Sequence, residues 1–263
     1  MRPDAQFGRA VTYSKLGLMV LREHFDQRPI EATFGSFRSL VPLRTPSGPQ
    51  WTESELETEL LDQLAFAPFV FDLITQPIIH YTRDGEPRRY TPDMAMQLHA
   101  TGDDLPSRYL IEVKRKEDLV RGAESHAVRF EVGCICAEEV GAVFRVMDES
   151  RIRTPYLRNA RLLAHHLGIE LSDHENDGIE ALRREKPMTV AVAIGLLGSA
   201  GYAEPDARHI IEHAVARRLV HADLAVPFTD ATIIMRHPQG IQRGVRSDPI
   251  LRLLQDAPDG VNI

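Results

Sequence analysis

Two short alternating stretches, residues 90–98 and 109–114, most constrain what this chain can fold into. Successive side chains of a β-strand point to opposite faces of its sheet, so Glu112 and Lys114 share one face. The segment between the two stretches holds Gly, Asp and Pro, which favour turns. The pattern therefore predicts two neighbouring antiparallel strands that bring Asp93, Glu112 and Lys114 within a few ångströms of one another.

These residue types suit metal-assisted hydrolysis of a phosphodiester. Asp93 and Glu112 offer hard oxygen ligands for Mg²⁺, a cation that keeps several waters and binds substrate phosphate as well. Such a metal generates a hydroxide nucleophile and clamps the attacked and leaving oxygens. Lys114 would orient the attacking water or offset charge in the transition state. The alternative is an exposed polar sheet face with an incidental Glu–Lys pair.

A third acid is expected on a helix from about 53 to 66, which a capping box opens. The apolar stripe of this helix consists of four leucines: Leu56, Leu60, Leu61 and Leu64. Its solvated side is expected to carry three acids: Glu55, Glu59 and Asp62. Glu57 falls inside the stripe, where a carboxylate is costly unless it is paired or ligated. A metal shared with Asp93 and Glu112 would be one partner; a salt bridge to an arginine or a partly exposed stripe edge is the alternative.

In chain order these motifs resemble the PD-(D/E)xK nuclease superfamily. More narrowly, they resemble the TnsA family, the endonuclease subunit of heteromeric cut-and-paste transposases. The resemblance covers roughly residues 30–235 and rests on four motifs: Ser54 to Glu57, Gln76-Pro77, Thr91 to Asp93, and Glu112 to Lys114. It implies that Glu57, Asp93 and Glu112 bind Mg²⁺, for which Mn²⁺ can substitute, and that Lys114 completes the catalytic site. Gln76 matches a recurrent family position and is an accessory candidate. The best-known member has glutamine where this chain has Glu112.

The function implied by the resemblance is a Mg²⁺-dependent DNA endonuclease. In that family the subunit cuts the 5′ strands of double-stranded DNA at transposon ends, beside a TnsB-like DDE recombinase that cuts the 3′ strands. A TnsC-like AAA+ ATPase regulator is a further implied partner. Two alternatives stay open: a stand-alone nuclease of the restriction or repair type, and a non-catalytic assembly factor that keeps the nuclease fold as a scaffold.

The charge balance bears on these alternatives. The net charge is −7 and the isoelectric point about 5.9, which argues against a stand-alone, non-specific DNA binder. Basic residues border the expected site and are candidates for phosphate contacts: Arg88, Arg89, Arg115, Lys116 and Arg121. No apolar run approaches the roughly 18 residues of a membrane span, and the first residues contain no secretory h-region. We therefore expect no membrane partner and a cytoplasmic protein. The resemblance implies a bacterial protein that is nucleoid-associated when assembled.

The expected fold class is α/β, a restriction-endonuclease-like mixed β-sheet flanked by helices, followed by a mostly helical winged-helix-like C-terminal domain. The expected parts are an N-terminal arm and first strand region over 1–50, the nuclease core over 51–150, the C-terminal domain over 151–236, and a tail over 237–263. In the core, the pattern predicts a strand over 76–81, a hairpin turn over 83–86, a helix over 119–140 and a last strand over 142–147. A helix that links two strands of one sheet favours parallel pairing.

In the C-terminal domain, the pattern predicts helices over 156–166 and 204–218, a loop with a short helix over 167–186, a segment buried on nearly all sides over 189–199, and a hairpin from 219–225 and 231–235. The tail is expected to be mobile or to bind a partner. Cys134 and Cys136 are two apart on a helix and do not face each other, so neither a disulfide nor a metal pair is expected. His209 and His213 share a helix face but lack a third ligand, which disfavours a zinc site.

Overall fold

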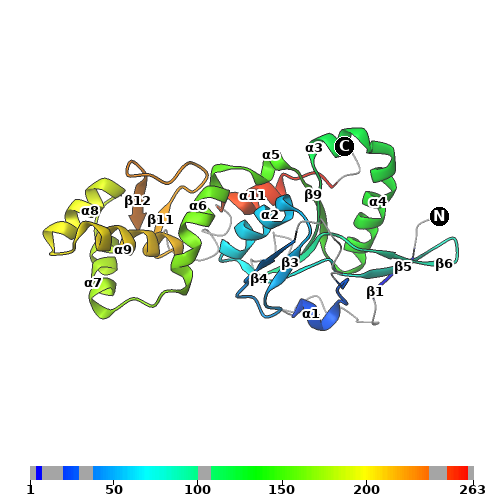
Figure 1. Cartoon of the computed structure of the whole chain (residues 1–263), viewed down its shortest axis with the longest axis horizontal. Coiled ribbons are helices and arrows are strands. Elements are labelled where there is room, and N and C mark those ends of the chain that lie inside the picture. Colours follow the sequence, from blue (N-terminus) through cyan, green and yellow to red (C-terminus); the bar gives the residue numbers. More distant parts are fainter. Residues whose placement is uncertain (1–3, 8–19, 30–37, 100–107, 237–247, 260–263) are drawn as a thin grey trace. The chain divides into compact units, whose positions relative to one another are not determined.

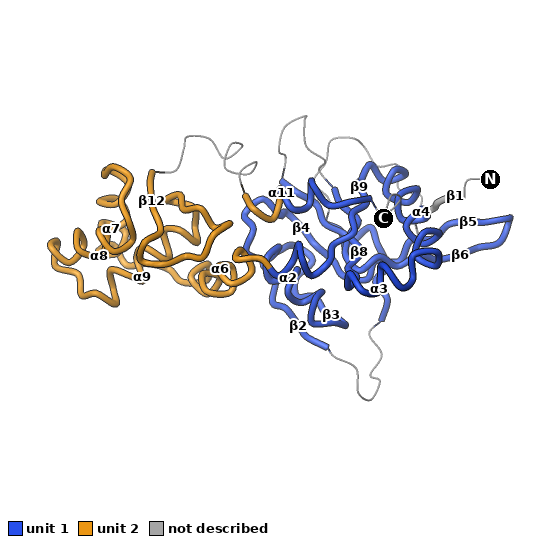
Figure 2. Tube along the Cα trace, turned by 90° about the horizontal axis from the view of Figure 1, so that it is seen from above, with its two compact units in different colours: residues 1–153, 252–263 blue, residues 154–251 orange. Residues whose placement is uncertain are grey.

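The computed structural model describes residues 4–7, 20–29, 38–99, 108–236 and 248–259. These residues form an α/β protein in which mixed sheets are flanked by helices, as the sequence predicts (Figure 1). The chain divides into two compact units, one made of Met1–Arg153 with Arg252–Ile263 and the other of Thr154–Leu251 (Figure 2). Within the described ranges, no helix is both long and apolar enough to cross a membrane.

The first unit is built on a four-stranded mixed sheet. Its strands are β4 (Val70–Thr75), β7 (Met94–Leu98), β8 (Arg108–Val113) and β9 (Val143–Met147), in the spatial order β4-β7-β8-β9. β7 pairs antiparallel with β8, and β9 pairs parallel with β8. Both pairings agree with the predictions from alternation and from the intervening helix.

β7 is shorter than the expected strand over 90–98. It begins at Met94, because the preceding strand ends at Tyr90 and Pro92 stands between them. Proline has no N–H to donate to a ladder, so it is found at strand ends rather than in strand interiors. The resulting break leaves Asp93 at the start of β7 instead of within it.

Helices connect β8 to β9 and cover one face of the sheet. The single helix expected over 119–140 is two helices, α3 (Lys116–Arg121) and α4 (Ala123–Glu139), which meet at Gly122. Phe130 of α4 packs on Phe144 of β9 with ring centroids 6.0 Å apart. A Cβ at Gly133 would lie only 2.6 Å from the Phe144 ring, so this close approach of helix to sheet requires glycine.

A second helix lies on the other side of the sheet. α2 (Glu55–Phe66) follows the predicted apolar stripe, and its four leucines are at most 3% exposed. Figure 1 shows α2 and α4 on opposite sides of β4 to β9. α5 (Glu149–Ile152) is a single turn that follows β9.

Two smaller sheets complete the first unit. β5 (Ile79–Arg83) and β6 (Glu86–Tyr90) form the predicted hairpin, with Asp84 and Gly85 in the left-handed region at its turn. β1 (Asp4–Phe7), which the sequence does not predict, pairs with β5. β2 (Ser39–Val41) pairs with β3 (Gln50–Thr52), and α1 (Leu21–His24) is a short turn in the expected arm. Residues 8–19 and 30–37 of that arm lie outside the described residues.

The second unit is mostly helical, with a small antiparallel sheet. Its elements are α6 (Pro155–Leu163), the 3₁₀ helix η1 (Ala164–Gly168), α7 (Asp173–Arg184), β10 (Met188–Thr189), α8 (Val190–Ser199), α9 (Glu204–Ala216), β11 (Val220–Ala222) and β12 (Ile233–Arg236). The sheet order is β10-β12-β11, so the expected hairpin is confirmed.

Two expectations for this unit are wrong. α7 is a full helix of 12 residues, opened by a capping box between Ser172 and Glu175 that the acidic composition of this segment concealed. α8 is not buried on all sides, because a helix presents one stripe to its neighbours. Val190 and Leu197 are fully buried, whereas Val192 is 58% exposed.

The described part of the expected tail is ordered. α11 (Pro249–Gln255) buries Ile250, Leu251 and Leu254. Beyond it, the carbonyl of Pro258 accepts a hydrogen bond from the Val146 amide of β9. The chain after Leu251 thus belongs to the first unit, so the expectation of a mobile end is wrong for residues 248–259, while the alternative of a partner-binding end stays a prediction. Residues 237–247 and 260–263 lie outside the described residues.

Candidate functional site

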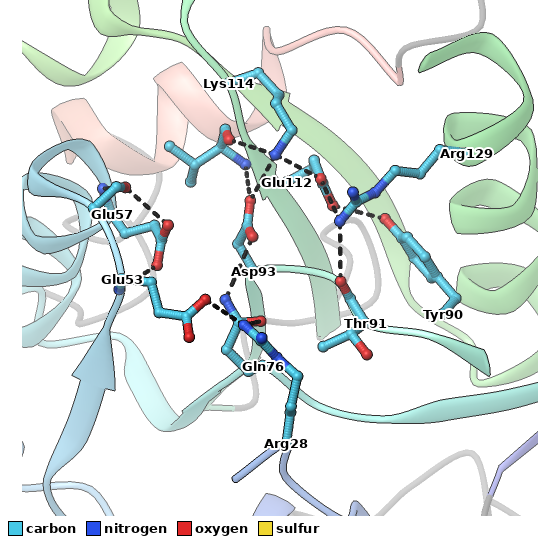
Figure 3. A network of polar contacts seen from close by, with 12 residues as sticks. Arg28, Glu53, Glu57, Gln76, Tyr90, Thr91, Asp93, Glu112, Lys114 and Arg129 are labelled. Carbon is cyan, nitrogen blue, oxygen red and sulfur yellow. Dashed lines mark hydrogen bonds and ion pairs between the residues drawn. The ribbon is translucent and has the colours of Figure 1, made fainter. Parts of the chain in front are cut away.

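Asp93 is fixed by the strand that pairs with its own. Its Oδ2 accepts a hydrogen bond of 2.7 Å from the Val113 amide at the end of β8, and the same oxygen lies 3.4 Å from Nζ of Lys114. The side chain is almost completely buried. Because Asp93 stands in the break before β7, its carboxylate reaches the Val113 N–H, which lies beyond the last β7–β8 pair of Met94 with Ile111 (Figure 3).

Glu112 has no exposed surface, and protein groups engage both of its oxygens. Oε1 lies 2.8 Å from Nζ of Lys114 and 2.9 Å from the guanidinium of Arg129. Oε2 accepts a hydrogen bond of 2.9 Å from the hydroxyl of Tyr90. The structure therefore brings Asp93, Glu112 and Lys114 together on one face, as the alternation predicts, and adds two groups that the sequence did not indicate.

Burial and mutual repulsion set the protonation of these groups. Desolvation, followed by the charge of Asp93, raises the pKa of Glu112 to about 7, although Lys114 and Arg129 oppose the shift. For Lys114, burial disfavours the charged form, but the carboxylates of Asp93 and Glu112 outweigh it and raise its pKa. The lysine is therefore an ammonium at neutral pH, while Glu112 exchanges its proton near pH 7.

Glu57 is held by the start of its own helix. Ser54 caps α2, donates through Oγ to Oε1 of Glu57 at 2.8 Å, and accepts from the Glu57 amide at 3.1 Å. The Glu53 amide donates to Oε2 at 3.0 Å. The helix N-terminus thus supplies partners for the buried Glu57, so its burial requires neither a metal nor an arginine, and its role as a Mg²⁺ ligand stays a prediction.

Glu57 nevertheless shares the electrostatics of the site. Burial, followed by the charge of Asp93, raises its pKa. Among the described residues, no hydrogen bond or ion pair joins Glu57 directly to Asp93, Glu112 or Lys114. The structure thus brings three of the four predicted site residues into contact and couples the fourth through charge alone.

Glu59 corrects a second expectation for the same helix. Helical periodicity predicts Glu59 on the solvated side, yet its carboxylate is 2.7 Å from Nε of Arg153 and the residue is only 6% exposed. Arg153 also lies 3.1 Å from Glu55. The short helix α5 brings this arginine over α2, which helical periodicity within α2 cannot reveal.

Gln76 lies next to Asp93 in a strained backbone conformation. Its φ is 52°, which is uncommon for a residue with a side chain. Its amide donates to the carbonyl of Asp93 at 3.0 Å, and its side-chain Nε2 lies 3.5 Å from Oδ1 of the same residue. Its Oε1 accepts from Arg28 at 2.9 Å, and Arg28 forms an ion pair with Glu53. Strain of this kind gathers at functional sites, which keeps Gln76 as an accessory candidate.

Three residues of this network escaped the sequence analysis: Arg28, Tyr90 and Arg129 (Figure 3). Arg129 reaches from α4 to Glu112, donates to the Thr91 carbonyl at 3.3 Å, and stacks over the Tyr90 ring with its guanidinium carbon 5.7 Å from the centroid. The one available signal was indirect: a buried carboxylate requires partners, but sequence spacing does not say from which element they come.

The basic residues expected to contact DNA are all exposed. Arg88 and Arg89 lie on β6, and Arg115 is the N-cap residue of α3. The Lys116 amide donates to Glu149 at 2.8 Å, and Arg121 forms an ion pair with Glu117 one helical turn away. The charge of Arg121 is thus partly neutralised, which leaves the other four as the better candidates for phosphate contacts.

The donor set fits Mg²⁺ in its chemistry. Glu57, Asp93 and Glu112 are buried carboxylates, the hard oxygen ligands that this cation prefers. The charge of Asp93 raises the pKa of the other two, a repulsion that a bound cation would relieve. Throughout the described ranges, no three His, Cys, Asp or Glu side chains already form a metal-binding group. Oε2 of Glu112 accepts a hydrogen bond from Tyr90, whereas Oε1 lies in ion pairs with Lys114 and Arg129 but accepts no hydrogen bond.

In the part of the chain that the structure describes, no hydrogen bond or ion pair joins the histidines and cysteines considered above to Glu57, Asp93 or Glu112. His209 and His213 of α9 lie near His166, with ring centroids 4.9 and 6.3 Å from the His166 ring. His166 Nε2 lies 3.1 Å from Glu212. Cys134 and Cys136 are free thiols.

Taken together, the first unit presents two buried carboxylates, one ammonium between them and a third acid coupled by charge. Such a group can bind a hard cation, hold a proton near neutral pH, and stabilise negative charge that develops on a phosphoryl oxygen. In comparisons with known proteins, no family model and no curated protein sequence matches this chain.

Proposed function

We propose that this protein is a metal-dependent DNA endonuclease that hydrolyses phosphodiester bonds. One observation carries the proposal: Lys114 lies within 3.4 Å of both Asp93 and Glu112, at the ends of two paired strands. Two buried acids of this kind would not be held beside each other for stability alone, because each raises the free energy of the other's charged form. If the two acids are Mg²⁺ ligands, the bound cation offsets the repulsion between their carboxylates.

Each residue of the site would have a distinct role in phosphodiester hydrolysis. A Mg²⁺ ion held by Glu57, Asp93 and Glu112 would supply the activated hydroxide and neutralise charge on the phosphate. Lys114 remains protonated and would stabilise negative charge on the phosphoryl group or orient the attacking water. Gln76, bonded to Asp93, would fix the orientation of that carboxylate.

More narrowly, we propose a TnsA-like subunit of a heteromeric transposase, with a restriction-endonuclease-like core and a winged-helix-like C-terminal domain. It would cut the 5′ strands of double-stranded DNA at transposon ends beside a DDE recombinase, under an AAA+ ATPase regulator, on the bacterial nucleoid. The order of the four motifs supports this reading. The net charge of −7 supports delivery to DNA by partners rather than solitary binding.

A second candidate is a non-catalytic assembly factor, and the state of Glu112 favours it. Arg129, Lys114 and Tyr90 engage both oxygens of this carboxylate. A protein that used the acid only for structure would keep these contacts permanently. A nuclease must let Glu112 exchange at least one of them for the metal.

Nicking of supercoiled plasmid DNA in Mg²⁺ or Mn²⁺ separates the two candidates. The wild-type chain should nick the plasmid, whereas Asp93→Asn should not. Each protein is assayed both alone and together with the recombinase subunit. Asp84→Asn, the same substitution at an exposed hairpin turn, is the matched control and should behave as wild type. Equal products from wild type and Asp93→Asn would remove the catalytic assignment and leave the assembly factor.

A further inference from the structure

A polar cavity of about 390 Å³ adjoins the acid network in the first unit. Gln76 and Arg28, which belong to the network in Figure 3, also line this cavity. Its lining includes two further arginines, Arg22 and Arg38, and none of the described lining residues is a carboxylate. Glu53 forms an ion pair with Arg28, so Arg22 and Arg38 supply most of the positive charge of this cavity, in a chain whose net charge is −7. This charge points to an anionic ligand.

An exposed aromatic ring stands at this cavity. Trp51, the only tryptophan of the chain, is the middle residue of β3 and is 46% exposed, while its neighbours Gln50 and Thr52 are buried. Leu40 lies directly opposite on β2 and is 48% exposed. Directly opposed residues of an antiparallel pair project to the same face, so the two side chains form a flat apolar platform beside three guanidinium groups.

The floor of the cavity is organised by its own hydrogen bonds. Nε2 of Gln27 donates to Oε1 of Gln50 and to the Thr75 carbonyl, both at 2.8 Å. The same Gln50 oxygen accepts from the Thr75 amide at 2.9 Å. A floor whose polar groups bond one another keeps its shape without a ligand, which lowers the ordering cost when one binds.

We propose that this cavity binds one unpaired nucleotide of the DNA strand, with its base stacked on Trp51 and its phosphate on the arginines. Aromatic platforms beside positively charged grooves are how proteins hold single-stranded nucleic acid, and guanidinium groups suit phosphate. The volume lies within the range of small-ligand pockets. The inference rests on the proposed nuclease function and deepens it: the substrate is locally unpaired next to the bond that is cut.

The neighbouring surface gives the strand a continuous path. Arg28 also lines a second cavity of about 410 Å³, together with Arg89, Arg129 and Tyr90. Arg28 thus joins the nucleotide cavity to one that touches the partners of Glu112. A phosphate backbone that follows these arginines would pass Gln76 and Tyr90, which contact Asp93 and Glu112.

The fluorescence of Trp51 measures binding at this cavity. The full-length chain is titrated with a single-stranded thymidine oligonucleotide, without divalent metal, while tryptophan fluorescence is recorded. We expect saturable quenching, and little quenching by inorganic phosphate or by a blunt duplex of the same length.

The anisotropy of a fluorescein-labelled oligonucleotide measures binding by the variants. Binding should be weakened about tenfold in Trp51→Ala, the loss of one base stack, and largely kept in Trp51→Phe. Arg22→Ala should also weaken binding, and Arg83→Ala, an exposed arginine outside the cavity, should not.

The outcomes separate this inference from the proposed function. Metal-dependent nicking with unchanged tryptophan fluorescence would overturn the nucleotide cavity and leave the nuclease intact. Quenching without nicking would support the cavity and count against catalysis. Equal quenching by inorganic phosphate, or equal affinity of Trp51→Ala and wild type at matched thermal stability, would refute base stacking.

Discussion

The guanidinium of Arg129, on helix α4, lies 2.9 Å from a carboxylate oxygen of Glu112, at the end of strand β8. Glu112 has no exposed surface, so this cation is one of the few groups that favour its charged form. Arg129 is itself partly exposed, with 42% of its side chain accessible. It therefore links a buried acid to solvent, where a phosphate group could compete for it.

Removal of Arg129 should raise the pKa of Glu112 above its present value of about 7, because one of the two cations that lower it is lost. In Arg129→Gln, the pH at which metal uptake is half-maximal should therefore move upward relative to wild type. Calorimetric titration with Mn²⁺ at a series of pH values measures this midpoint, with Arg83→Gln as control. A midpoint that stays in place or moves downward would contradict the assigned role of Arg129.

Glu112 should also give stability an unusual pH dependence. An acid whose pKa is raised on folding binds its proton more tightly in the folded state, so stability falls as pH rises from about 4.5 to about 7. The full shift corresponds to about 3 kcal/mol. Urea unfolding followed by Trp51 fluorescence, which reports the first unit, should show this decline in wild type. The decline should be smaller in Glu112→Gln; parallel pH profiles for the two proteins would refute the raised pKa.

His213 of α9 predicts the opposite pH dependence of stability for the second unit. Burial, helped by Arg217 and by His166 and His209, lowers the pKa of His213 to about 4. A histidine that is harder to protonate when folded contributes stability at neutral pH that is lost as pH falls from about 6.5 toward 4. Hydrogen exchange in peptides of α9 should accelerate over that interval.

His213→Gln should flatten this dependence, and His80→Gln, an exposed residue of the first unit, should leave it unchanged. Glu175 also faces this cluster and favours the protonated form of His213, so its presence limits the effect. Exchange rates in α9 that do not respond to pH, after correction for intrinsic exchange, would show that His213 is not buried as a neutral group.

The cap of α2 should matter for both stability and chemistry. Ser54→Ala removes the hydroxyl that caps the helix and that bonds Glu57, at a cost of about 1 kcal/mol. The freed Glu57 side chain should also lower DNA nicking by more than the loss of folded protein explains. Ser125→Ala, in the first turn of α4, is the control. Unchanged nicking per folded molecule in Ser54→Ala would remove Glu57 from the catalytic set.

Much of the site was predictable from local pattern. Period-two alternation and a turn between two strands were enough to bring Asp93, Glu112 and Lys114 together, because strand pairing follows from neighbouring sequence. Helical periodicity likewise identified Glu57 as a buried acid of α2. These predictions depended on residues close in the chain and on one hairpin-like pairing.

The partners of those acids could not be predicted in the same way. Arg129, Arg153 and Arg28 reach their carboxylates from separate helices and loops, so their roles depend on tertiary packing that no period encodes. The cap of α2 supplies hydrogen-bond partners for Glu57 that its position in the apolar stripe does not reveal. The pairing of β2 with β3 places Trp51 on the same face as Leu40, and the local sequence does not encode this pairing.

Calorimetric titration of Mn²⁺ in the presence of a short DNA duplex tests the central claim most directly. Wild type and Asp84→Asn should take up the metal, and Asp93→Asn should lose that uptake, because Asp93 contacts both the β8 backbone and Lys114 at the centre of the site. Equal uptake by wild type and Asp93→Asn, or none by wild type, would contradict the metal-dependent nuclease and favour the assembly factor.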